Sequence, residues 1–368
     1  MEKESENFPL NFFKNKKIII TGINGFKGFW LLAILERLGA KVSGIGINDK
    51  NLLVFKKLSL TKKNFFNFLD ITDLKKLKKY ISSKKPDIIF HLASESLVFD
   101  CYKNPSKAVH TNILGLSNLL IVLKQIRFKN KLGVNVVTSD KCYLPDKKKT
   151  YLETDKLGGN DIYSATKACQ EILTNAFFKS YFENNKKFFF NTFRAGNVVG
   201  GGDYSSNRLF PDIYKSIKSN SKLSIRNKNS TRPWQHVLDT LHGYLLAARY
   251  SFLNEKNYSS WNFSPLKKSY KVSDIIKILN KNKILKKNKV QFKKNIVKET
   301  KYLNLNPKKA KNLLNWRPIY QLEETIKDTF DVYDIFDKKI NSKTKAEILN
   351  KRIDTFLNKI YGDSYRRK

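Results

Sequence analysis

The sequence predicts an α/β fold, a Rossmann-type doubly wound parallel sheet followed by a smaller C-terminal α/β lobe. Apolar, strand-like runs alternate with helical patterns through about the first 200 residues, and repeated βα units of this kind form parallel sheets. Three glycines, Gly22, Gly25 and Gly28, stand three residues apart between the first such run and the first helical pattern. Beyond about residue 200 the alternation gives way to a glycine-rich loop, short strands and helices, which predicts the second lobe.

The three glycines lie in a strand-to-helix turn. Residues 16–20 read KKIII, a β-branched run typical of a buried parallel strand. Residues 29–42 form an amphipathic helical pattern that closes at Gly39 and leads into another strand. Glycine lets such a turn approach a pyrophosphate closely, and the free N–H groups at the start of the helix face the anion. This context favours a dinucleotide site over the alternative, a plain tight turn.

The remaining elements of the first half follow in order. Strands are expected within 41–47, 87–94, 134–140 and 188–200, and helices within 71–83, 105–125 and 163–182. Ligands of doubly wound sheets bind beyond the carboxyl ends of the strands. The residues at these ends therefore share one edge of the sheet: Gly22, Ser94, Glu95, Ser139, Asp140, Lys141 and Asn197.

The chain divides into three predicted parts. Residues 1–200, joined by about 236–258, form the dinucleotide-binding Rossmann domain, and residues 201–335 form a smaller lobe that covers the ligand. Residues 336–368 are highly charged and are expected to be a peripheral tail that ends in a helix.

Composition excludes several classes of protein. The apolar fraction of 41% fits a globular chain, and no stretch approaches the ~18 uninterrupted apolar residues of a membrane helix. The N-terminus lacks the apolar segment of a secretory signal, so a cytoplasmic protein is expected. Cys101, Cys142 and Cys169 have no zinc or redox spacing, and no metal site is expected.

The net charge of +39 raises the possibility of a nucleic-acid partner. The lysines are spread along the whole chain, however, and only residues 281–298 are dense, with eight lysines and no acid. Charge runs are usually solvated surfaces, so no specific nucleic acid and no membrane partner is expected. A positive field can still steer an anionic small molecule into a site.

Tyr163 and Lys167 stand four residues apart, and therefore on one face of a helix. Tyrosine is a poor base at its ordinary pKa near 10, but a neighbouring ammonium favours the phenolate and can also hold a ribose hydroxyl. The pair suits removal of a hydroxyl proton while a nicotinamide accepts hydride. A tyrosine and a lysine at this spacing are common, and the alternative is an exposed pair on a helix with no catalytic role. The glycine-rich turn earlier in the chain favours the catalytic interpretation.

These motifs together resemble the extended short-chain dehydrogenase/reductases, whose members rework nucleotide sugars. A closer resemblance is to the CDP-glucose 4,6-dehydratase family, and it extends over roughly residues 14–330. The segments that carry it are TGINGFKGFW, TSDKCY, LGGNDIYSATKAC, RAGNVVGGGDY, NRLFPD and TRPWQHVLDTLHGYLL, with LNPKKAKNLLNWRP resembling the wider group.

The resemblance implies a reaction and assigns its residues. The sugar C4 hydroxyl is oxidised, water is eliminated across C5 and C6, and the hydride returns to C6. Tyr163, assisted by Lys167, takes the C4 hydroxyl proton, with Ser139 bonded to the same oxygen. Where related dehydratases carry an Asp-Glu pair, this chain has Asp140 as the acid and Lys141 as the base, and a water molecule is the alternative base. Burial is expected to shift the pKa of both groups in the direction these roles need.

The resemblance also implies NAD as cofactor, with NADP not excluded. Many NAD-binding relatives end the second strand with an acid that holds the ribose, whereas here that place is near Gly46, and Asp49 follows in the loop. No arginine stands nearby for a 2′-phosphate. The expected cofactor-binding residues are Gly22, Asn24, Gly25, Phe26, Gly28, Asp70, Ile71, Leu92, Ala93, Ser94, Thr138, Tyr163 and Lys167.

The substrate is expected to be a small-molecule nucleotide sugar. Arginine's fork suits phosphate oxygens better than lysine does, and two arginines stand out among the lysines. The expected substrate-binding residues are Asn197, Arg208, Arg232, Trp234 and Trp261, with Asn262 beside the last. The family further implies a homodimer through the helices at 105–125 and 163–182, and a place in deoxysugar biosynthesis such as that of lipopolysaccharide O-antigen.

Three alternatives remain at this point. One is the same chemistry on another nucleotide sugar. A second is an epimerase that oxidises and reduces C4 without elimination, against which the Ser139-Asp140-Lys141 triplet argues because an epimerase has no leaving group to protonate. The third is a non-catalytic protein that uses its basic surface on nucleic acid or anionic lipid.

Overall fold

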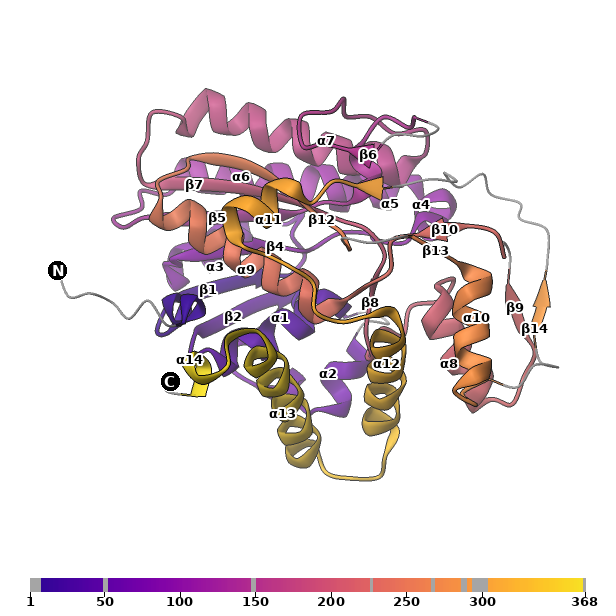
Figure 1. The fold of residues 1–368 in the computed structure, drawn as a ribbon. Helices are drawn as coiled ribbons and strands as arrows, with labels where there is room; N and C mark the ends of the chain where they lie inside the picture. Colours follow the sequence, from indigo (N-terminus) through magenta and orange to yellow (C-terminus); the bar gives the residue numbers. More distant parts are fainter. Residues whose placement is uncertain are drawn as a thin grey trace.

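A seven-stranded parallel sheet forms the centre of the molecule (Figure 1). The computed structural model describes residues 8–48, 52–146, 150–225, 228–265, 269–285, 290–292 and 304–366. The strand order is β12-β7-β5-β4-β1-β2-β3, and every neighbouring pair is parallel. This confirms the predicted doubly wound sheet. Its strands are β1 (Lys17–Thr21), β2 (Lys41–Gly46), β3 (Phe66–Phe68), β4 (Ile88–His91), β5 (Leu132–Val137), β7 (Phe188–Ala195) and β12 (Tyr258–Phe263).

Helices cover both faces of the sheet, which explains the uninterrupted apolar strands. In β1, Ile18 and Ile20 belong to the hydrophobic cluster on one face, and Ile19 belongs to the cluster on the other. The first face is covered by α1 (Phe26–Arg37), α2 (Leu53–Lys57), α9 (Val237–Leu253) and α13 (Ser342–Tyr361). The second face is covered by α3 (Leu74–Lys84), α6 (Gly115–Gln125) and the end of the helix that begins as α7 (Ile162–Phe177).

The two helices predicted at 105–125 and 163–182 are present, and each contains one wider π turn. The first runs through α5 (Pro105–Val109), a π turn over His110–Leu114, and α6. The second continues from α7 into a π turn over Phe178–Phe182. The short α4 (Val98–Lys103) packs against α5 and α7. These helices place Tyr163 and Lys167 beside the carboxyl ends of the central strands.

The second lobe has a hydrophobic cluster of its own, built from α8 (Leu209–Lys218), α10 (Val272–Lys281) and the face of α12 (Leu322–Asp337) that packs on them. It lies at the right of Figure 1, beyond the carboxyl ends of the central strands. Its elements are α8 (Leu209–Lys218), β9 (Leu223–Ile225), β10 (Thr231–Arg232), β13 (Tyr270–Lys271), α10 (Val272–Lys281) and β14 (Val290–Phe292). Smaller pairs join β8 (Val198–Val199) to β11 (Gln235–His236) and β6 (Thr150–Tyr151) to β15 (Asn304–Leu305), and α11 (Lys308–Leu314) follows.

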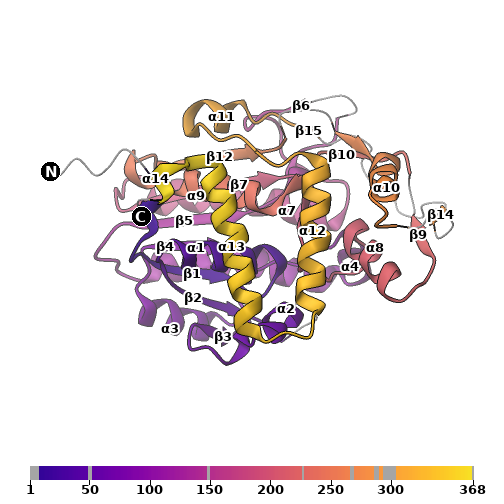
Figure 2. The ribbon, with the colours of Figure 1, turned by 60° about the horizontal axis from the view of Figure 1, so that its bottom comes forward.

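Two predicted boundaries differ from the structure. Residues 258–263 were expected in the smaller lobe, but they form β12 and pair with β7 in the central sheet. Residues 336–368 were expected to be a peripheral tail. Instead α12 (Leu322–Asp337) and α13 form two long helices side by side across the molecule (Figure 2), followed by α14 (Asp363–Arg366).

Helix α13 is part of the core because its apolar residues recur on one face. Leu349, Ile353, Phe356 and Leu357 are buried in the cluster that contains α1, and Arg37 of α1 forms an ion pair with Asp354 at 2.5 Å. Most of the other charged residues of α13 are exposed, and Asp354, Arg352 and Lys345 have partners on α1 and α12. The segment is therefore an amphipathic helix whose apolar residues follow i, i+4 and i+7 spacing, although its high charge suggested a peripheral tail.

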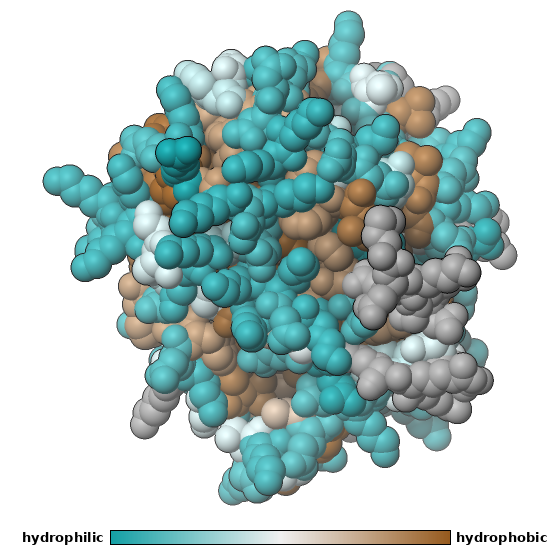
Figure 3. Space-filling model, turned by 90° about the vertical axis from the view of Figure 1, so that its left-hand side faces the viewer, coloured by the Kyte–Doolittle hydropathy of each residue, from teal (hydrophilic) through white to brown (hydrophobic). Residues whose placement is uncertain are grey.

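The surface is mainly hydrophilic on the face that Figure 3 draws. On the face drawn in Figure 3, hydrophilic side chains cover most of the area and hydrophobic ones form separate small groups between them. The dense lysine run at 281–298 lies largely outside the described residues. Within the described ranges, no helix is both long and apolar enough to span a bilayer.

Candidate active site

A cavity of about 830 Å³ lies where the carboxyl ends of the central strands meet the smaller lobe. Its size suits a ligand larger than a simple metabolite. The cavity wall includes every residue that the sequence predicted for catalysis and for the cofactor, and four of the five predicted for the substrate. The exception is Trp261.

The glycine turn forms the floor of this cavity, between β1 and α1. Gly22 has a φ of +69°, and a Cβ there would lie 2.7 Å from the backbone nitrogen of Ala93. A Cβ on Gly28 would lie 2.2 Å from the carbonyl oxygen of Gly22. Gly25 begins α1 as its N-cap residue, which leaves the first helical N–H groups directed at the cavity. The backbone thus fits a pyrophosphate held at a helix N-terminus.

Asn24 explains why this chain lacks an acid at the end of β2. Its side-chain amide donates to the carbonyl oxygen of Ile47 at 2.9 Å, and a Cβ on Gly46 would lie 1.9 Å from the Asn24 Oδ1 atom. Asn24 therefore occupies the space that a larger residue at position 46 would need. Asp49, the other candidate for the ribose, lies outside the described residues.

The walls toward the adenine and ribose ends come from the loops after β3 and β4. Asp70 accepts hydrogen bonds from the backbone N–H and the hydroxyl of Thr72, at 2.9 and 2.8 Å. Ser94 donates to the side-chain oxygen of Asn112 at 2.9 Å. Leu92, Ala93 and Ile71 complete an apolar surface beside them, as expected for a site that receives a flat ring.

Tyr163 and Lys167 project from the first turns of α7 into the cavity. Asp161 caps this helix by accepting from the backbone N–H of Ser164 at 3.0 Å. Lys167 Nζ donates to the side-chain oxygen of Gln170 at 2.9 Å and to the carbonyl of Val137 at 3.3 Å. Burial, and then the charge of Lys27, lower the pKa of Lys167 to about 7. Lys167 thus changes protonation near neutral pH.

The Tyr163 hydroxyl lies among polar groups. Burial raises its pKa above the ordinary value, while a hydrogen bond with Ser139 opposes this shift. Ser139 also donates to Asp140 Oδ1 at 2.9 Å. Ser139 therefore connects the group that would accept a proton with the carboxyl group of the next residue.

Asp140 begins a short 3₁₀ turn over Asp140–Cys142 directly after β5. The residue is 3% exposed, and its Oδ2 atom has no hydrogen-bond partner in the described part of the chain. Lys141 beside it remains partly exposed on the cavity wall. The two side chains form no ion pair within the described ranges, so the carboxyl group is available to a ligand. The burial expected for Lys141 is only partial.

The substrate end of the cavity contains Asn197, Arg208, Arg232 and Trp234. Arg208 pairs with Asp203 at 2.9 Å and donates to the carbonyl of Ser96 at 3.3 Å, so it crosses from the smaller lobe to the loop after β4. The Trp234 indole N–H donates to the carbonyl of Tyr270 at 3.4 Å. Two arginines and an indole thus surround one end of the cavity.

The prediction that Trp261 and Asn262 line the substrate site is wrong. Both lie in β12 and are fully buried. The Trp261 indole N–H donates to Asn191 at 2.9 Å, and Lys309 covers its ring with Nζ 4.5 Å from the centroid. Because β12 joins the central sheet, these side chains pack inside the domain.

Lys27 and Asp203 are cavity residues that sequence reasoning did not select. Both stand inside motifs that were recognised, Lys27 in the glycine turn and Asp203 in the glycine-rich loop after β8. The sequence signal for Lys27 was its position between Gly25 and Gly28. A charged residue there lies close to the anion that the turn is expected to bind.

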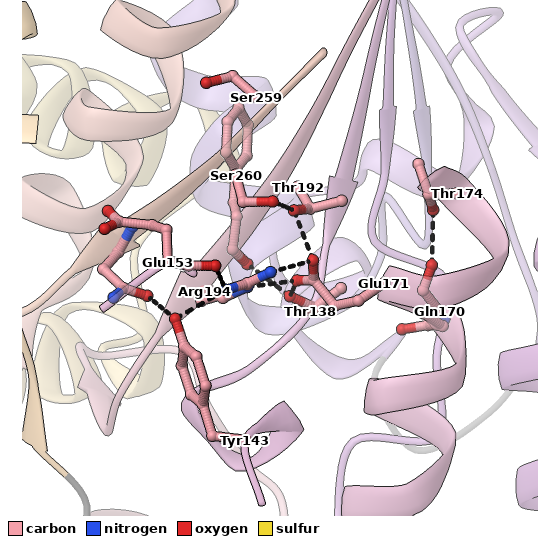
Figure 4. Close-up of polar contacts among 12 residues, drawn as sticks. Thr138, Tyr143, Glu153, Gln170, Glu171, Thr174, Thr192, Arg194, Ser259 and Ser260 are labelled. Carbon is pink, nitrogen blue, oxygen red and sulfur yellow. Dashed lines mark hydrogen bonds and ion pairs between the residues drawn. The ribbon is translucent and has the colours of Figure 1, made fainter. Parts of the chain in front are cut away.

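A buried ion pair joins α7 to β7 beside the site (Figure 4). Arg194 of β7 and Glu171 of α7 are 3% and 1% exposed and meet at 2.7 Å. Glu171 also accepts from the hydroxyls of Thr138 at 2.5 Å and Thr192 at 2.7 Å. Since Glu171 lies one turn after Lys167, this network fixes α7 against β5 and β7. It holds the Tyr163–Lys167 pair in register with the residues that follow Thr138.

Replacing Glu171 with glutamine is expected to lower the free energy of unfolding by about 3–5 kcal/mol, because it leaves the Arg194 charge buried without its partner. Chemical denaturation of the purified variant measures this loss. Glu255→Gln is the matched control, since Glu255 forms an exposed pair with Lys131 at 2.8 Å, and no measurable change is expected there. Equal effects of the two substitutions would contradict the structural importance of the buried pair.

Comparisons with known proteins find relatives over most of the chain. The family model described as GDP-mannose 4,6 dehydratase matches residues 19–329. The chain is 36% identical over 328 residues to CDP-glucose 4,6-dehydratase of Salmonella typhimurium, which covers 86% of this chain and 90% of that protein.

Solved structures share the fold. UDP-glucuronic acid 4-epimerase from Bacillus cereus, in complex with UDP-glucuronic acid and NAD, aligns with a TM-score of 0.74 at 23% identity, over 86% of this chain and 98% of that one. dTDP-glucose 4,6-dehydratase from Bacillus anthracis, in complex with NAD, aligns with a TM-score of 0.70 at 20% identity, over 86% and 96%.

Proposed function

The chain belongs to the CDP-glucose 4,6-dehydratase family of extended short-chain dehydrogenase/reductases, and from this membership we propose that it converts CDP-glucose to CDP-4-keto-6-deoxyglucose. Membership makes it a nucleotide-sugar 4,6-dehydratase, an NAD-dependent hydro-lyase. The observation that supports elimination is Asp140, a buried carboxyl group whose Oδ2 has no partner among the described residues, in the same cavity as Tyr163 and Lys167. An epimerase has no leaving group that such a carboxyl group would protonate.

Different parts of the cavity wall would hold the pyrophosphate, the adenine and the nicotinamide ribose of NAD. The turn at Gly22, Gly25 and Gly28 receives the pyrophosphate, Asp70 and Ile71 lie at the adenine end, and Ala93 and Ser94 lie toward the nicotinamide ribose. The close packing of the glycine turn fits this role, because a Cβ at Gly22 or Gly28 would displace backbone. When bound, NAD supplies the acceptor for the C4 hydride and the donor that returns it to C6.

The first task of the chain is removal of the C4 hydroxyl proton. Tyr163 accepts it, and the Ser139 hydroxyl, which donates to Asp140 in the protein without ligand, turns to donate to the same sugar oxygen. Lys167, held by Gln170 and Val137, provides the positive charge that stabilises the phenolate. The C4 carbonyl that results makes the C5 proton acidic, because loss of that proton gives an enolate.

The second task is elimination of water. Lys141 removes the C5 proton, and the electron pair forms the C5–C6 double bond as the C6–O bond breaks. Asp140 donates its proton to the departing C6 hydroxyl, which leaves as water. The proton that Lys141 takes exchanges with solvent, since Lys141 is partly exposed, and a solvent proton is later returned to C5.

Incubation with isotopically labelled sugar tests this function. CDP-glucose carrying deuterium at C4 is expected to lose one water and to retain deuterium in the new C6 methyl group, while C5 acquires a hydrogen from solvent. Mass spectrometry and NMR measure the two events. Parallel reactions with dTDP-glucose and GDP-mannose are expected to show no loss of water. Return of deuterium to C4 without water loss would identify an epimerase, and an unchanged mass with all three sugars would overturn the proposal.

A homodimer is the proposed assembly, with a second copy of the chain covering an apolar helical face. Val109, Leu114, Ile162 and Ile172 are 36–54% exposed on the two helices that begin at α5 and α7. Sedimentation at twice the chain mass of 42.8 kDa would support this assembly. We place the enzyme in the cytoplasm, where nucleotide sugars are made, and in a deoxysugar pathway such as that of O-antigen.

A further inference from the structure

Lys27 occupies a position where a positive charge is costly. It is the second residue of α1, where the helix dipole repels cations. Its Nζ reaches across the cavity floor to the hydroxyl of Tyr244 at 3.3 Å and lies 5.7 Å from the centroid of that ring. Tyr244 is a rigid partner, since its ring is fully buried and stacks on Phe193 with centroids 4.7 Å apart.

Lys27 lines the same cavity wall as Lys167, Tyr163 and Asp140, and Arg208 stands on that wall beside its partner Asp203. Burial, and then the charge of Arg208, lower the pKa of Lys27 to about 8, and Asp140 opposes the shift. Lys167 of α7 is the third cation of the group. Tyr244 of α9 is the neutral partner, and its hydroxyl interacts electrostatically with Tyr163 and Asp140. Three cations therefore share this part of the cavity with two carboxyl groups, Asp140 and Asp203, and with two tyrosines.

We propose that Lys27 is a positioning residue of the reaction centre: its charge acts on Lys167, favours loss of the first proton from the Tyr163–Lys167 pair, and so sets the lowest pH at which the C4 hydroxyl can be deprotonated. This inference deepens the proposed function and rests on it for the reaction, but not for the titration of Lys167. Cations are normally unfavourable at a helix N-terminus. A residue that departs from such a preference inside a ligand site is a candidate for a functional role.

The direction follows from like charges. A positive Lys27 makes a second positive charge at Lys167 less stable, and it makes a phenolate at Tyr163 more stable. In either case the pair gives up its first proton at lower pH, and that macroscopic pKa belongs to the pair. Removal of the Lys27 charge therefore raises the pKa at which the pair becomes able to accept a proton from the sugar.

Titration of Lys167 in the protein without ligands is the first test. Trace acetylation by acetic anhydride across a pH series, with mass spectrometry of the Lys167 peptide, reports the fraction of free amine. In Lys27→Met the midpoint is expected to move to higher pH by about one unit, the order expected for one charge across a buried site. Lys277→Met is the control, since the Lys277 side chain is 81% exposed on α10, and it should leave the midpoint unchanged. An unchanged midpoint in Lys27→Met would overturn the proposal.

The pH profile of cofactor reduction by CDP-glucose is the second test. Lys27→Met is expected to shift the acid limb of the single-turnover rate upward by about one pH unit, and Lys27→Arg, which keeps the charge, is expected to restore it. A rate lowered equally at every pH would show that Lys27 only packs the site, and would overturn the proposal. If CDP-glucose gives no reduction at all, the proposed function fails while the acetylation result still decides the role of Lys27.

A second variant covers the case in which Lys27→Met does not fold. Tyr244→Phe keeps the ring that packs on Phe193 and removes only the hydroxyl that holds Lys27 Nζ. It is expected to shift the Lys167 midpoint in the same direction by a smaller amount, because the ammonium is then less well fixed. A midpoint identical to that of the unmodified protein would contradict the proposed coupling.

Discussion

Replacing Tyr163 with phenylalanine is expected to lower the rate of C4 oxidation by about 10³–10⁴-fold, the upper range for loss of a positioned proton acceptor. The phenyl ring fills the same buried position, so the fold is retained and only the hydroxyl is lost. Without it, neither Ser139 nor Lys167 can take the sugar proton in the same geometry. Stopped-flow measurement of the reduced nicotinamide after mixing the NAD-loaded protein with CDP-glucose gives the rate.

The control for this change is Tyr181→Phe. Tyr181 lies in the π turn that follows α7 and is 50% exposed, so the same loss of one hydroxyl there should leave the oxidation rate unchanged. Equal thermal stability of both variants would show that the Tyr163 effect is chemical. Oxidation at an undiminished rate in Tyr163→Phe would remove Tyr163 from the reaction.

Replacing Asp140 with asparagine is expected to separate oxidation from elimination. Asparagine keeps the size of the side chain and an oxygen that accepts from Ser139, but it has no acidic proton for the departing hydroxyl. Oxidation should therefore proceed and reduced cofactor should accumulate, while the rate of water loss falls by about 10²–10⁴-fold. Absorbance follows the cofactor, and mass spectrometry of the sugar follows the loss of water in the same sample.

The matched control is Asp334→Asn on α12, where the side chain is 59% exposed, and full turnover is expected. If Asp140→Asn turned over CDP-glucose at the normal rate, the assignment of Asp140 as the acid would be wrong. If it abolished cofactor reduction as well, Asp140 would instead act in the first step, through its hydrogen bond with Ser139.

Much of the fold could be predicted because its signals are local. Runs such as residues 18–20 are apolar on both sides of the strand, so they predict a strand covered on both faces. The glycines at 22 and 28 fit a backbone too tight for a Cβ, and Tyr163 and Lys167 share a helix face by their spacing alone. Each of these properties depends on residues a few positions apart.

The two wrong predictions, for Trp261 and for the C-terminal segment, have one physical cause. Trp261 was expected at the substrate together with Asn262, yet β12 inserts beside β7 and buries both side chains. The segment after residue 336 was placed outside the core because of its charge, yet one face of α13 carries the apolar side chains that pack on α1. Both outcomes depend on contacts between parts of the chain that are distant in sequence, and no local pattern states which partner will cover a face.

The sequence by itself determined the sheet, the glycine turn and the residue types that gather at the carboxyl ends of the strands. Only the tertiary structure decided which of those side chains meet in one cavity, and that Lys27 meets Tyr244 across 217 positions of the chain. It also decided that Glu171 and Arg194 are fully desolvated together. The reason is that strand and helix patterns are set by near neighbours, whereas burial and the charges that surround a buried group are set by the packing of the whole chain.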